Sequence, residues 1–177
     1  MSVTVEGINE IFNEIKKASS EQSVQKALAS LKFEGVKEVK GDVNVVILTV
    51  PYKQISAFRQ IQTIIIPELE KKLDGALVVL VGKRRAFPVT PEDGRRYRVI
   101  RPHGRTLRAV NDALLDDVCF PTAIVGKRVH YNLQGKQETH VILDAHDRTR
   151  VEDRLTAFGA AYQRLTGIKT VFEVADH

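Results

Sequence analysis

Residues 44–82, NVVILTVPYKQISAFRQIQTIIIPELEKKLDGALVVLVG, decide the fold of this chain. The segment opens with an apolar run that ends at Pro51, and it closes with a second apolar run at 76–82. Short unbroken apolar runs are typical of buried strands. Between them, apolar residues recur at helical spacing from about residue 53 to residue 73, which predicts a long amphipathic helix. Strands that flank a helix in this way predict a layer of sheet packed against helix.

One residue inside the predicted helix is unusual. Pro67 has no backbone N–H, and a proline ring clashes with the preceding helical turn. We therefore expect a kink or a restart of the helix near Ile66. Gly75 then ends the helix before the second strand.

Upstream of this segment, the pattern predicts two short helices and one more strand. Apolar residues at helical spacing within 8–15 and 24–31 predict the helices, with an N-cap at Ser19-Ser20 between them. Residues 36–39 and 44–50 are predicted to be the two strands of a hairpin around a Gly41-Asp42 turn.

Downstream, the end signals and the periodicity predict a second set of elements. They are a helix from Thr106 to about Asp117, strands at 127–133 and 137–143 around a turn at 134–136, a helix from Asp147 to Gly167, and a strand at 168–174. The sequence shows no internal repeat.

Together these elements predict an α+β protein with a mixed, largely antiparallel sheet packed with helices. We expect an N-terminal α/β lobe at 1–82, a long basic loop at 83–105 and a C-terminal α/β lobe at 106–177. The second lobe is expected to pack on the first as a single compact unit.

Positive charge is concentrated in one segment. The formal net charge of +5 comes from 27 basic and 22 acidic residues. Residues 1–82 hold ten of each, residues 83–108 hold nine basic and two acidic, and residues 109–177 hold eight basic and ten acidic. The three parts therefore carry 0, +7 and −2, so the entire excess lies in 26 residues.

The basic segment favours arginine over lysine. It contains eight of the 14 arginines but only one of the 13 lysines. A solvated loop would serve with either residue, whereas guanidinium groups grip phosphate in a bidentate fashion and stack on bases. Tyr97 and His103 are interleaved and suit stacking on unpaired bases. The pattern favours a polyanion partner, recognised by backbone and shape, with a salt slope of roughly −3 to −5 if about five residues engage.

Three other groups of residues could bind a metal ion or take part in catalysis, but each has a simpler structural explanation. His130 and His140 would lie opposite each other if the hairpin loop were 134–136, which raises a metal hypothesis, but exposed cross-strand partners fit them better. Asp112 and Asp116 are helical neighbours that a Mg²⁺-dependent nuclease would use, although a solvated helix face is commoner. The single cysteine, Cys119, lies in an apolar run typical of core packing in a reducing compartment.

Several motifs in order resemble one family, the eukaryote-specific small-subunit ribosomal protein seven family. The most specific are TLRAVNDALLDDVCFP at 106–121 and IVGKR at 124–128, followed by ELEKKLDG at 68–75, KRR at 83–85, LTG at 165–167 and VFE at 171–173. The match covers most of the chain and is weakest before about residue 40. The acidic pair Glu92-Asp93 in the basic loop, and Pro67, depart from the family pattern.

The resemblance implies a structural constituent of the small subunit of the eukaryotic cytosolic ribosome. Similar proteins contact small-subunit ribosomal RNA, neighbouring ribosomal proteins and early assembly factors, and they pass through a nucleolar assembly stage. They are not enzymes, and the resemblance implies no cofactor, no membrane and no small-molecule substrate. The residues expected at RNA combine the basic segment with the IVGKR motif. They are Lys83, Arg84, Arg85, Arg95, Arg96, Tyr97, Arg98, Arg101, His103, Arg105, Arg108, Lys127 and Arg128.

Two rival functions stay open at this stage. One is a free-standing RNA-binding or RNA-chaperone module, and the other is a metal-dependent RNA-processing enzyme that uses Asp112 and Asp116. If the ribosomal reading holds, charge reversal of Arg84, Arg85 and Arg105 is expected to block entry into subunits and to leave the isolated fold intact.

Overall fold

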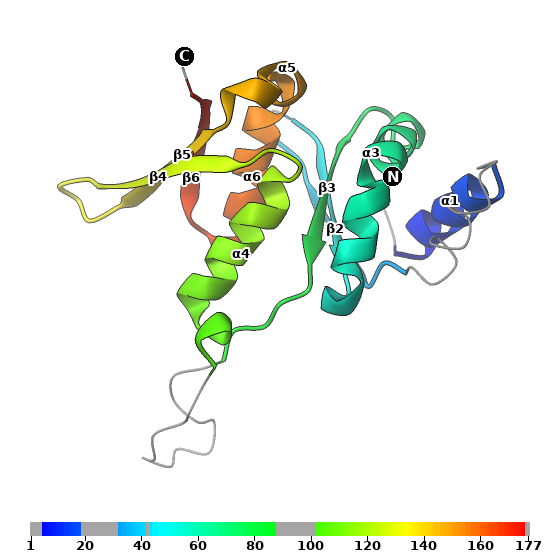
Figure 1. The fold of residues 1–177 in the computed structure, drawn as a ribbon, viewed down its shortest axis with the longest axis horizontal. Helices are drawn as coiled ribbons and strands as arrows, with labels where there is room; N and C mark the ends of the chain where they lie inside the picture. Colours follow the sequence, from blue (N-terminus) through cyan, green and yellow to red (C-terminus); the bar gives the residue numbers. More distant parts are fainter. Residues whose placement is uncertain (1–4, 19–31, 42, 88–101, 176–177) are drawn as a thin grey trace, which may run out of the picture.

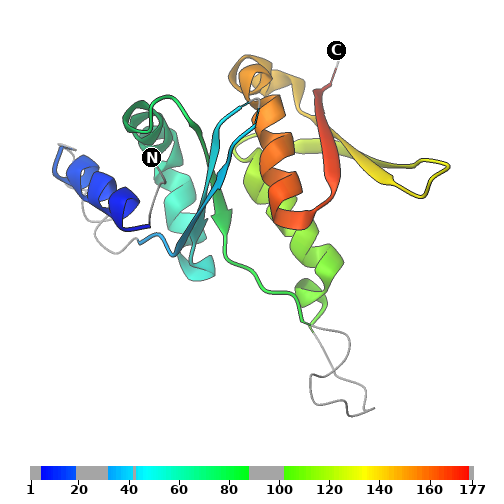
Figure 2. The same cartoon turned by 180° about the vertical axis from the view of Figure 1, so that it is seen from behind.

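A computed structural model of the chain describes residues 5–18, 32–41, 43–87 and 102–175. The described part has four layers, in which helices and sheets alternate (Figures 1 and 2). Helices α1 (Val5–Ala18) and α3 (Ile55–Lys72) form the first layer, and the sheet β1-β2-β3 forms the second. Helices α4 (Leu107–Cys119) and α6 (Leu155–Thr166) form the third layer, and the sheet β4-β5-β6 forms the fourth.

Residues 44–82 supply two of the three strands of the first sheet. Strands β1 (Gly35–Val39) and β2 (Val45–Val50) form the expected hairpin, and β3 (Leu77–Gly82) returns parallel to β2. Helices cover both faces of β2 and β3, because α1 and α3 lie on one side and α4 and α6 on the other. This double burial explains why both strands read as unbroken apolar runs.

The first core lies between this sheet and the helices α1 and α3. Leu48 of β2 and Leu69 of α3 are fully buried there. Phe33 packs between Phe12 and Phe58, with ring centroids 5.0 and 5.1 Å away. Aromatic packing of this kind stabilises the contact of α1 with α3 beyond the area that it buries.

Helix α3 continues through Pro67. Of the kink or restart predicted near Ile66, the restart is therefore not observed. Pro67 and Thr63, one turn earlier, are both exposed. The carbonyl that loses its intrahelical partner therefore lies on the solvent side, where water satisfies it at little cost. A 3₁₀ turn, η1 (Tyr52–Gln54), precedes the helix.

The second sheet repeats the topology of the first. Strands β4 (Ile124–Tyr131) and β5 (Gln137–Leu143) form a hairpin, and β6 (Lys169–Val174) lies parallel to β5. The expected α+β class with mixed β-structure is confirmed. The strands nevertheless form two three-stranded sheets, with equal numbers of parallel and antiparallel pairs, where the sequence predicted one largely antiparallel sheet.

The helix predicted from Asp147 to Gly167 is divided into short pieces before its long part begins. The pieces are η3 (Ala145–Asp147), α5 (Arg148–Val151) and η4 (Glu152–Arg154), and α6 follows them. Gly167 ends α6 with φ +76°, as its type predicted. The second predicted helix, at 24–31, lies outside the described residues.

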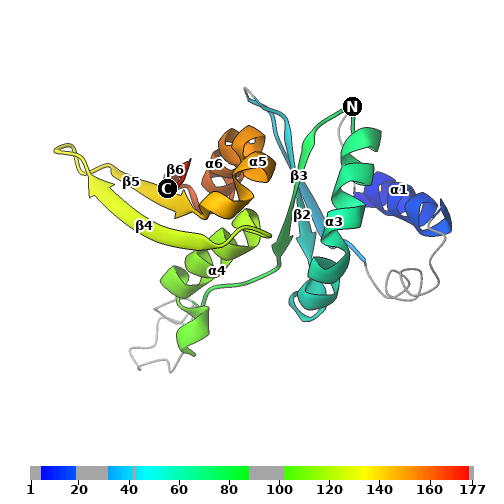
Figure 3. The same cartoon turned by 45° about the horizontal axis from the view of Figure 1, so that its top comes forward.

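The second core fills the space between the two sheets (Figure 3). Ile47 of β2, Tyr162 of α6 and Val141 of β5 are each at most 1% exposed and belong to this one cluster. In the described part of the chain, no helix covers the opposite face of β4-β5-β6 (Figure 3). Among the described residues, no helix has the length and apolarity needed to cross a bilayer.

Candidate nucleic-acid interface

The structure describes the two ends of the basic segment, residues 83–87 and 102–108, which we call the arm root. Five predicted RNA-binding residues lie outside the described residues. They are Arg95, Arg96, Tyr97, Arg98 and Arg101. The other eight can be placed, six of them in the arm root and two on β4.

The two parts of the arm root contact each other, and we call residues 83–87 the outgoing leg and residues 102–108 the returning leg. The backbone N–H of Phe87 donates to the carbonyl of Arg105 at 2.9 Å. The guanidinium of Arg105 also lies over the ring of Phe87, 5.4 Å from its centroid. A cation over an aromatic face is attracted by the ring quadrupole. Both contacts hold the outgoing leg next to the returning leg.

The returning leg is fixed to the start of α4. After the 3₁₀ turn η2 (His103–Arg105), Thr106 accepts a hydrogen bond from the N–H of Ala109 at 3.3 Å. Its hydroxyl also donates to the carbonyl of His103 at 3.0 Å. The side chain of Thr106 therefore caps the helix as its type predicts, and the cap sets where the returning leg ends.

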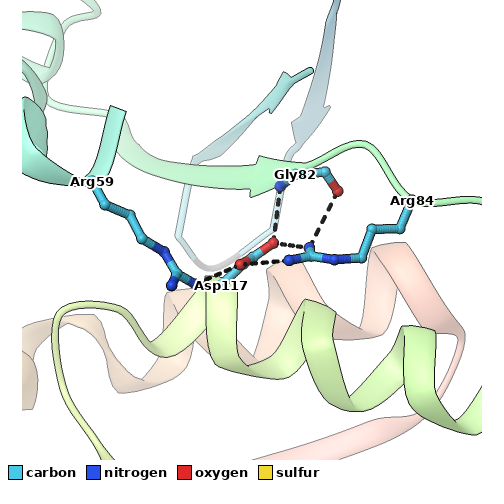
Figure 4. A network of polar contacts seen from close by, with 4 residues as sticks. All are labelled: Arg59, Gly82, Arg84 and Asp117. Carbon is cyan, nitrogen blue, oxygen red and sulfur yellow. Dashed lines mark hydrogen bonds and ion pairs between the residues drawn. The ribbon is translucent and has the colours of Figure 1, made fainter. Parts of the chain in front are cut away.

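The outgoing leg is fixed by a buried carboxylate on the same helix. Asp117 is 2% exposed, and it accepts from both Nη atoms of Arg84 and from Arg59 Nη2 at 2.7 Å (Figure 4). It also accepts from the backbone N–H of Gly82 at 2.9 Å. Arg84 is further held over the ring of Tyr52, 5.4 Å from its centroid. A buried carboxylate requires such compensation, so these contacts lock the end of β3 onto α4.

A side chain at Gly82, at the end of β3, would crowd the Asp117 network. A Cβ on Gly82 would lie 2.7 Å from Cδ1 of Ile55 and 3.2 Å from Oδ2 of Asp117. The second of these contacts would press on the carboxylate that accepts the N–H of Gly82 itself. The close approach therefore accounts for a glycine that ends an otherwise apolar strand.

The arm root leaves a small set of cations facing solvent. Arg85, His103, Arg105 and Arg108 are all exposed. Lys83 is exposed too but pairs with Glu34 at 2.9 Å. Arg84 differs from all of these, because only 15% of its side chain is exposed and its charge is neutralised by Asp117. The structure thus divides the KRR motif into one paired lysine, one internal arginine and one outward arginine.

The two predicted residues on β4 lie on opposite faces of the second sheet. Lys127 points toward α4 and pairs with Asp112 at 2.5 Å. Arg128 lies on the uncovered face, directly opposite His140 of β5. Neither lies in the arm root.

Comparison with known proteins decides the family. The family model described as ribosomal protein S7e matches residues 5–174. This chain belongs to the ribosomal protein S7e family. The resemblance read from the sequence motifs is thereby confirmed.

Curated relatives named "Small ribosomal subunit protein eS7" support the S7e assignment. The Caenorhabditis elegans relative is 36% identical over 177 residues, which cover 96% of this chain and 91% of the relative. The Candida albicans (strain SC5314 / ATCC MYA-2876) relative is 38% identical over 157 residues, covering 88% and 84%. The Secale cereale relative is 43% identical over 136 residues, covering 77% and 69%. The S7e family consists of structural proteins of the ribosome, so the expectation of a non-enzyme is confirmed.

In this S7e chain, two of the acidic residues on α4 serve the fold. Asp117 anchors the arm root, and Asp112 pairs with Lys127. Cys119 is fully buried, as predicted, and burial raises the pKa of its thiol to about 12, with Asp116 adding to the effect. Such a thiol stays protonated and does not act as a nucleophile at neutral pH.

The histidines of the hairpin are close, but the predicted register was wrong by one residue in the loop. Asn132 pairs with Lys136, so the three-residue loop is 133–135 and His130 lies opposite Glu138. His130 and His140 are diagonal neighbours on the uncovered face, with ring centroids 4.9 Å apart. Among the residues that the structure describes, no cluster of three or more His, Cys, Asp or Glu side chains suits a metal ion.

Sequence reasoning missed two ion pairs that join distant parts of the S7e fold. One is Arg59 with Asp117, and the other is Glu70 with Arg154 at 2.7 Å. Glu70 also accepts from the N–H of Val78 at the start of β3. The available signal was that Arg59 and Asp117 each lie directly beside an apolar position of an amphipathic helix, where a charge needs a partner.

Proposed function

We propose that the chain binds small-subunit ribosomal RNA through its basic segment, as a structural constituent of the small subunit of the eukaryotic cytosolic ribosome. The proposal assigns the first contacts to Arg85 and Arg105 of the arm root, with Arg128 as a separate contact on β4. It includes neighbouring ribosomal proteins and early assembly factors as partners, and a nucleolar stage of assembly before the cytoplasmic one.

The observation that carries this proposal is the division of charge. Residues 83–108 carry +7, whereas the rest of the chain carries −2. Outside this segment, many cations are already used in ion pairs, such as Lys72 with Glu14 and Lys169 with Glu138. The arm root instead presents Arg85 and Arg105 to solvent, and neither forms an ion pair with a carboxylate of the described residues. Exposed guanidinium groups on an otherwise acidic body favour a phosphate backbone as their counter-ion.

The anchoring of both legs supports the same proposal. The contact of Arg84 with Asp117 fixes the outgoing leg to α4, and the Thr106 cap fixes the returning leg to the start of the same helix. A root held in this way presents its cations at fixed positions before RNA arrives. Binding then loses less conformational entropy than it would with a free loop.

The test is a matched pair of charge reversals in the full chain. Arg85→Glu with Arg105→Glu removes two predicted phosphate contacts, whereas Arg150→Glu with Arg164→Glu makes the same change in charge at exposed sites outside the segment. Binding to a transcript of small-subunit ribosomal RNA is measured against salt. The arm variant should lower the steepness of the log–log salt dependence by about 1.4 to 1.8, since each phosphate contributes about 0.7 to 0.9.

The control variant should keep a slope nearer to that of the parent chain. Equal slopes for the two variants would contradict the proposal. In cells, the arm variant should be depleted from small subunits on a gradient, while the control enters them. A free-standing RNA-binding module would retain the salt effect but would not co-sediment with subunits in either form.

Arg84 should be left out of this test, contrary to the expectation from sequence. Its guanidinium neutralises the buried Asp117, so charge reversal would place two carboxylates together inside the fold. The loss of stability would then be confused with a loss of RNA contact. Arg85 and Arg105 are exposed, and neither pairs with a buried carboxylate of the described residues, so their reversal creates no buried carboxylate pair. Thermal unfolding of the Arg105→Glu chain checks that loss of its contact with Phe87 leaves the fold intact.

A further inference from the structure

Among the described residues, no strand pairs with the outer edge of β4 in the β4–β5 hairpin, and we call this the free edge. Strand β4 lies at one side of the sheet order β4-β5-β6, and the hairpin extends away from the helices (Figures 1 and 3). Residues 127–131 of this strand are all exposed. Natural proteins usually shorten, charge or cover such an edge, because it offers unpaired backbone groups to another chain.

The register identifies which backbone groups face outward. The N–H of Asn132 donates to the carbonyl of Lys136, so the backbone of Asn132 faces the partner strand of the hairpin. Hydrogen-bonded and non-bonded pairs alternate along an antiparallel ladder. Arg128 and His130 therefore direct their backbone groups to β5, and Lys127, Val129 and Tyr131 direct theirs to the free edge.

The side chains of the outward-facing residues border a trough that is lined by both apolar and polar residues. Val129 is 40% exposed and Tyr131 is 72% exposed, and both line a hollow of about 780 Å³ between the hairpin and α4. Leu107, at the start of α4, is 63% exposed in the same hollow. Leu133 at the hairpin tip is fully exposed. Large apolar side chains gathered in this way are typical of a binding surface.

The charge of the trough argues for protein and against RNA. Two cations and two carboxylates line it, Arg108 and Lys127 against Asp112 and Asp116. Lys127 is already paired with Asp112 at 2.5 Å. A phosphate backbone would meet two carboxylates with no net positive charge to offset them. Tyrosine and leucine, by contrast, suit the desolvated core of a protein interface.

We propose that the free edge of β4 accepts an extended segment of a neighbouring protein as a fourth strand. The added strand would hydrogen-bond to the backbone of Lys127, Val129 and Tyr131. Residues directly opposite them lie on the same face of the sheet, so alternate apolar side chains of the partner cover Val129 and Tyr131 and enter the trough. That the partner is a component of the small subunit rests on the proposed function.

The first test is site-specific photocrosslinking in the full chain. p-Benzoylphenylalanine replaces Tyr131 in one variant and His130 in a matched control. The two residues are adjacent and exposed, but they belong to opposite faces of the sheet. Small subunits that contain each variant are purified and irradiated, and adducts are separated into protein and RNA and normalised to the chain recovered in subunits.

Position 131 should give a protein adduct that maps to one extended segment, with a yield about tenfold above position 130. An RNA adduct at position 131, or a protein yield equal to that of the control, would overturn the proposal. Arg85 and Arg105 take no part in this edge. The outcome is therefore separable from the RNA-binding test above, and either can fail alone.

The second test asks whether the backbone edge itself is used. Val129→Pro removes only an N–H that faces outward, and edge positions tolerate proline when their N–H faces solvent. Val129→Thr keeps both the N–H and the β-branched shape. Loss of one hydrogen bond worth about 1 kcal/mol, together with the steric effect of the ring, should lower the adduct yield at position 131 about tenfold in the proline variant. Equal yields in the proline and threonine variants would rule out strand addition.

Discussion

The two sheets of this S7e chain share one topology but have different surroundings. Each consists of a hairpin followed by helical structure and a strand parallel to the second strand of the hairpin. Helices cover both faces of β1-β2-β3, whereas α4 and α6 cover only one face of β4-β5-β6. Strand β2 is accordingly buried at five of its six positions, and β5 is buried only at alternate ones. The sheet β1-β2-β3 therefore contributes more buried area to the stability of the fold, whereas β4-β5-β6 leaves one face exposed for contacts with other molecules.

The largest expected effect tests this contrast in the central strand of each sheet. Leu48→Ala empties a fully buried site and should cost about 3 to 4 kcal/mol. Ile142→Ala lies on the uncovered face of β5 and should cost about 1 kcal/mol or less. Chemical denaturation of both variants gives the two free energies of unfolding. Similar losses would mean that the second sheet is covered as completely as the first.

The next effect tests the ion pairs that join α4 to α3 and to the end of β3. Asp117→Asn removes the charge that neutralises Arg59 and Arg84, and it should cost about 2 to 3 kcal/mol, since Arg59 is partly exposed. Asp112→Asn makes the same change at an exposed pair with Lys127 and should cost less than about 1 kcal/mol. Thermal and urea unfolding would separate the two. Equal costs would show that the Asp117 network does not hold the arm root to the core.

The smallest effect concerns a carboxylate on the uncovered face. The hydrogen bond from Lys169, and the charge of that lysine, hold the pKa of Glu138 below its ordinary value of 4.5. A lowered folded-state pKa adds stability above the ordinary value, and this contribution is lost as pH falls through the folded value. The pair lies at the surface, so Glu138→Gln should leave Tm at pH 7 unchanged within error. A clear drop in Tm would mean that this face is more enclosed than its exposure indicates.

Burial explains which parts of the fold could be predicted from sequence. The strands β2 and β3 were visible because coverage on both faces leaves unbroken apolar runs, and β5 was visible because coverage on one face leaves alternation. The division into two sheets was not visible, since periodicity carries no information on which strands pair. The hairpin register was missed because Leu133 reads as a strand residue, although it lies in the loop.

The sequence predicts where the candidate site lies, and this stays a prediction, but it does not predict how the cations there divide between paired and exposed ones. Nine basic residues in 26 mark the segment without any knowledge of the fold. Arg84 looks the same as Arg85 in the sequence, and only the approach of Asp117 from α4, 33 positions away, separates them. The partner of a cation depends on tertiary contacts, so composition identifies an arm but not the residues that anchor it.

The most direct test of this account is an electron cryo-microscopy structure of the small subunit that contains this chain. The account predicts that the guanidinium groups of Arg85 and Arg105 lie within hydrogen-bonding distance of RNA phosphates, about 3 Å, while Arg84 stays on Asp117. Finding Arg85 and Arg105 in open solvent, away from any nucleotide, would contradict the account.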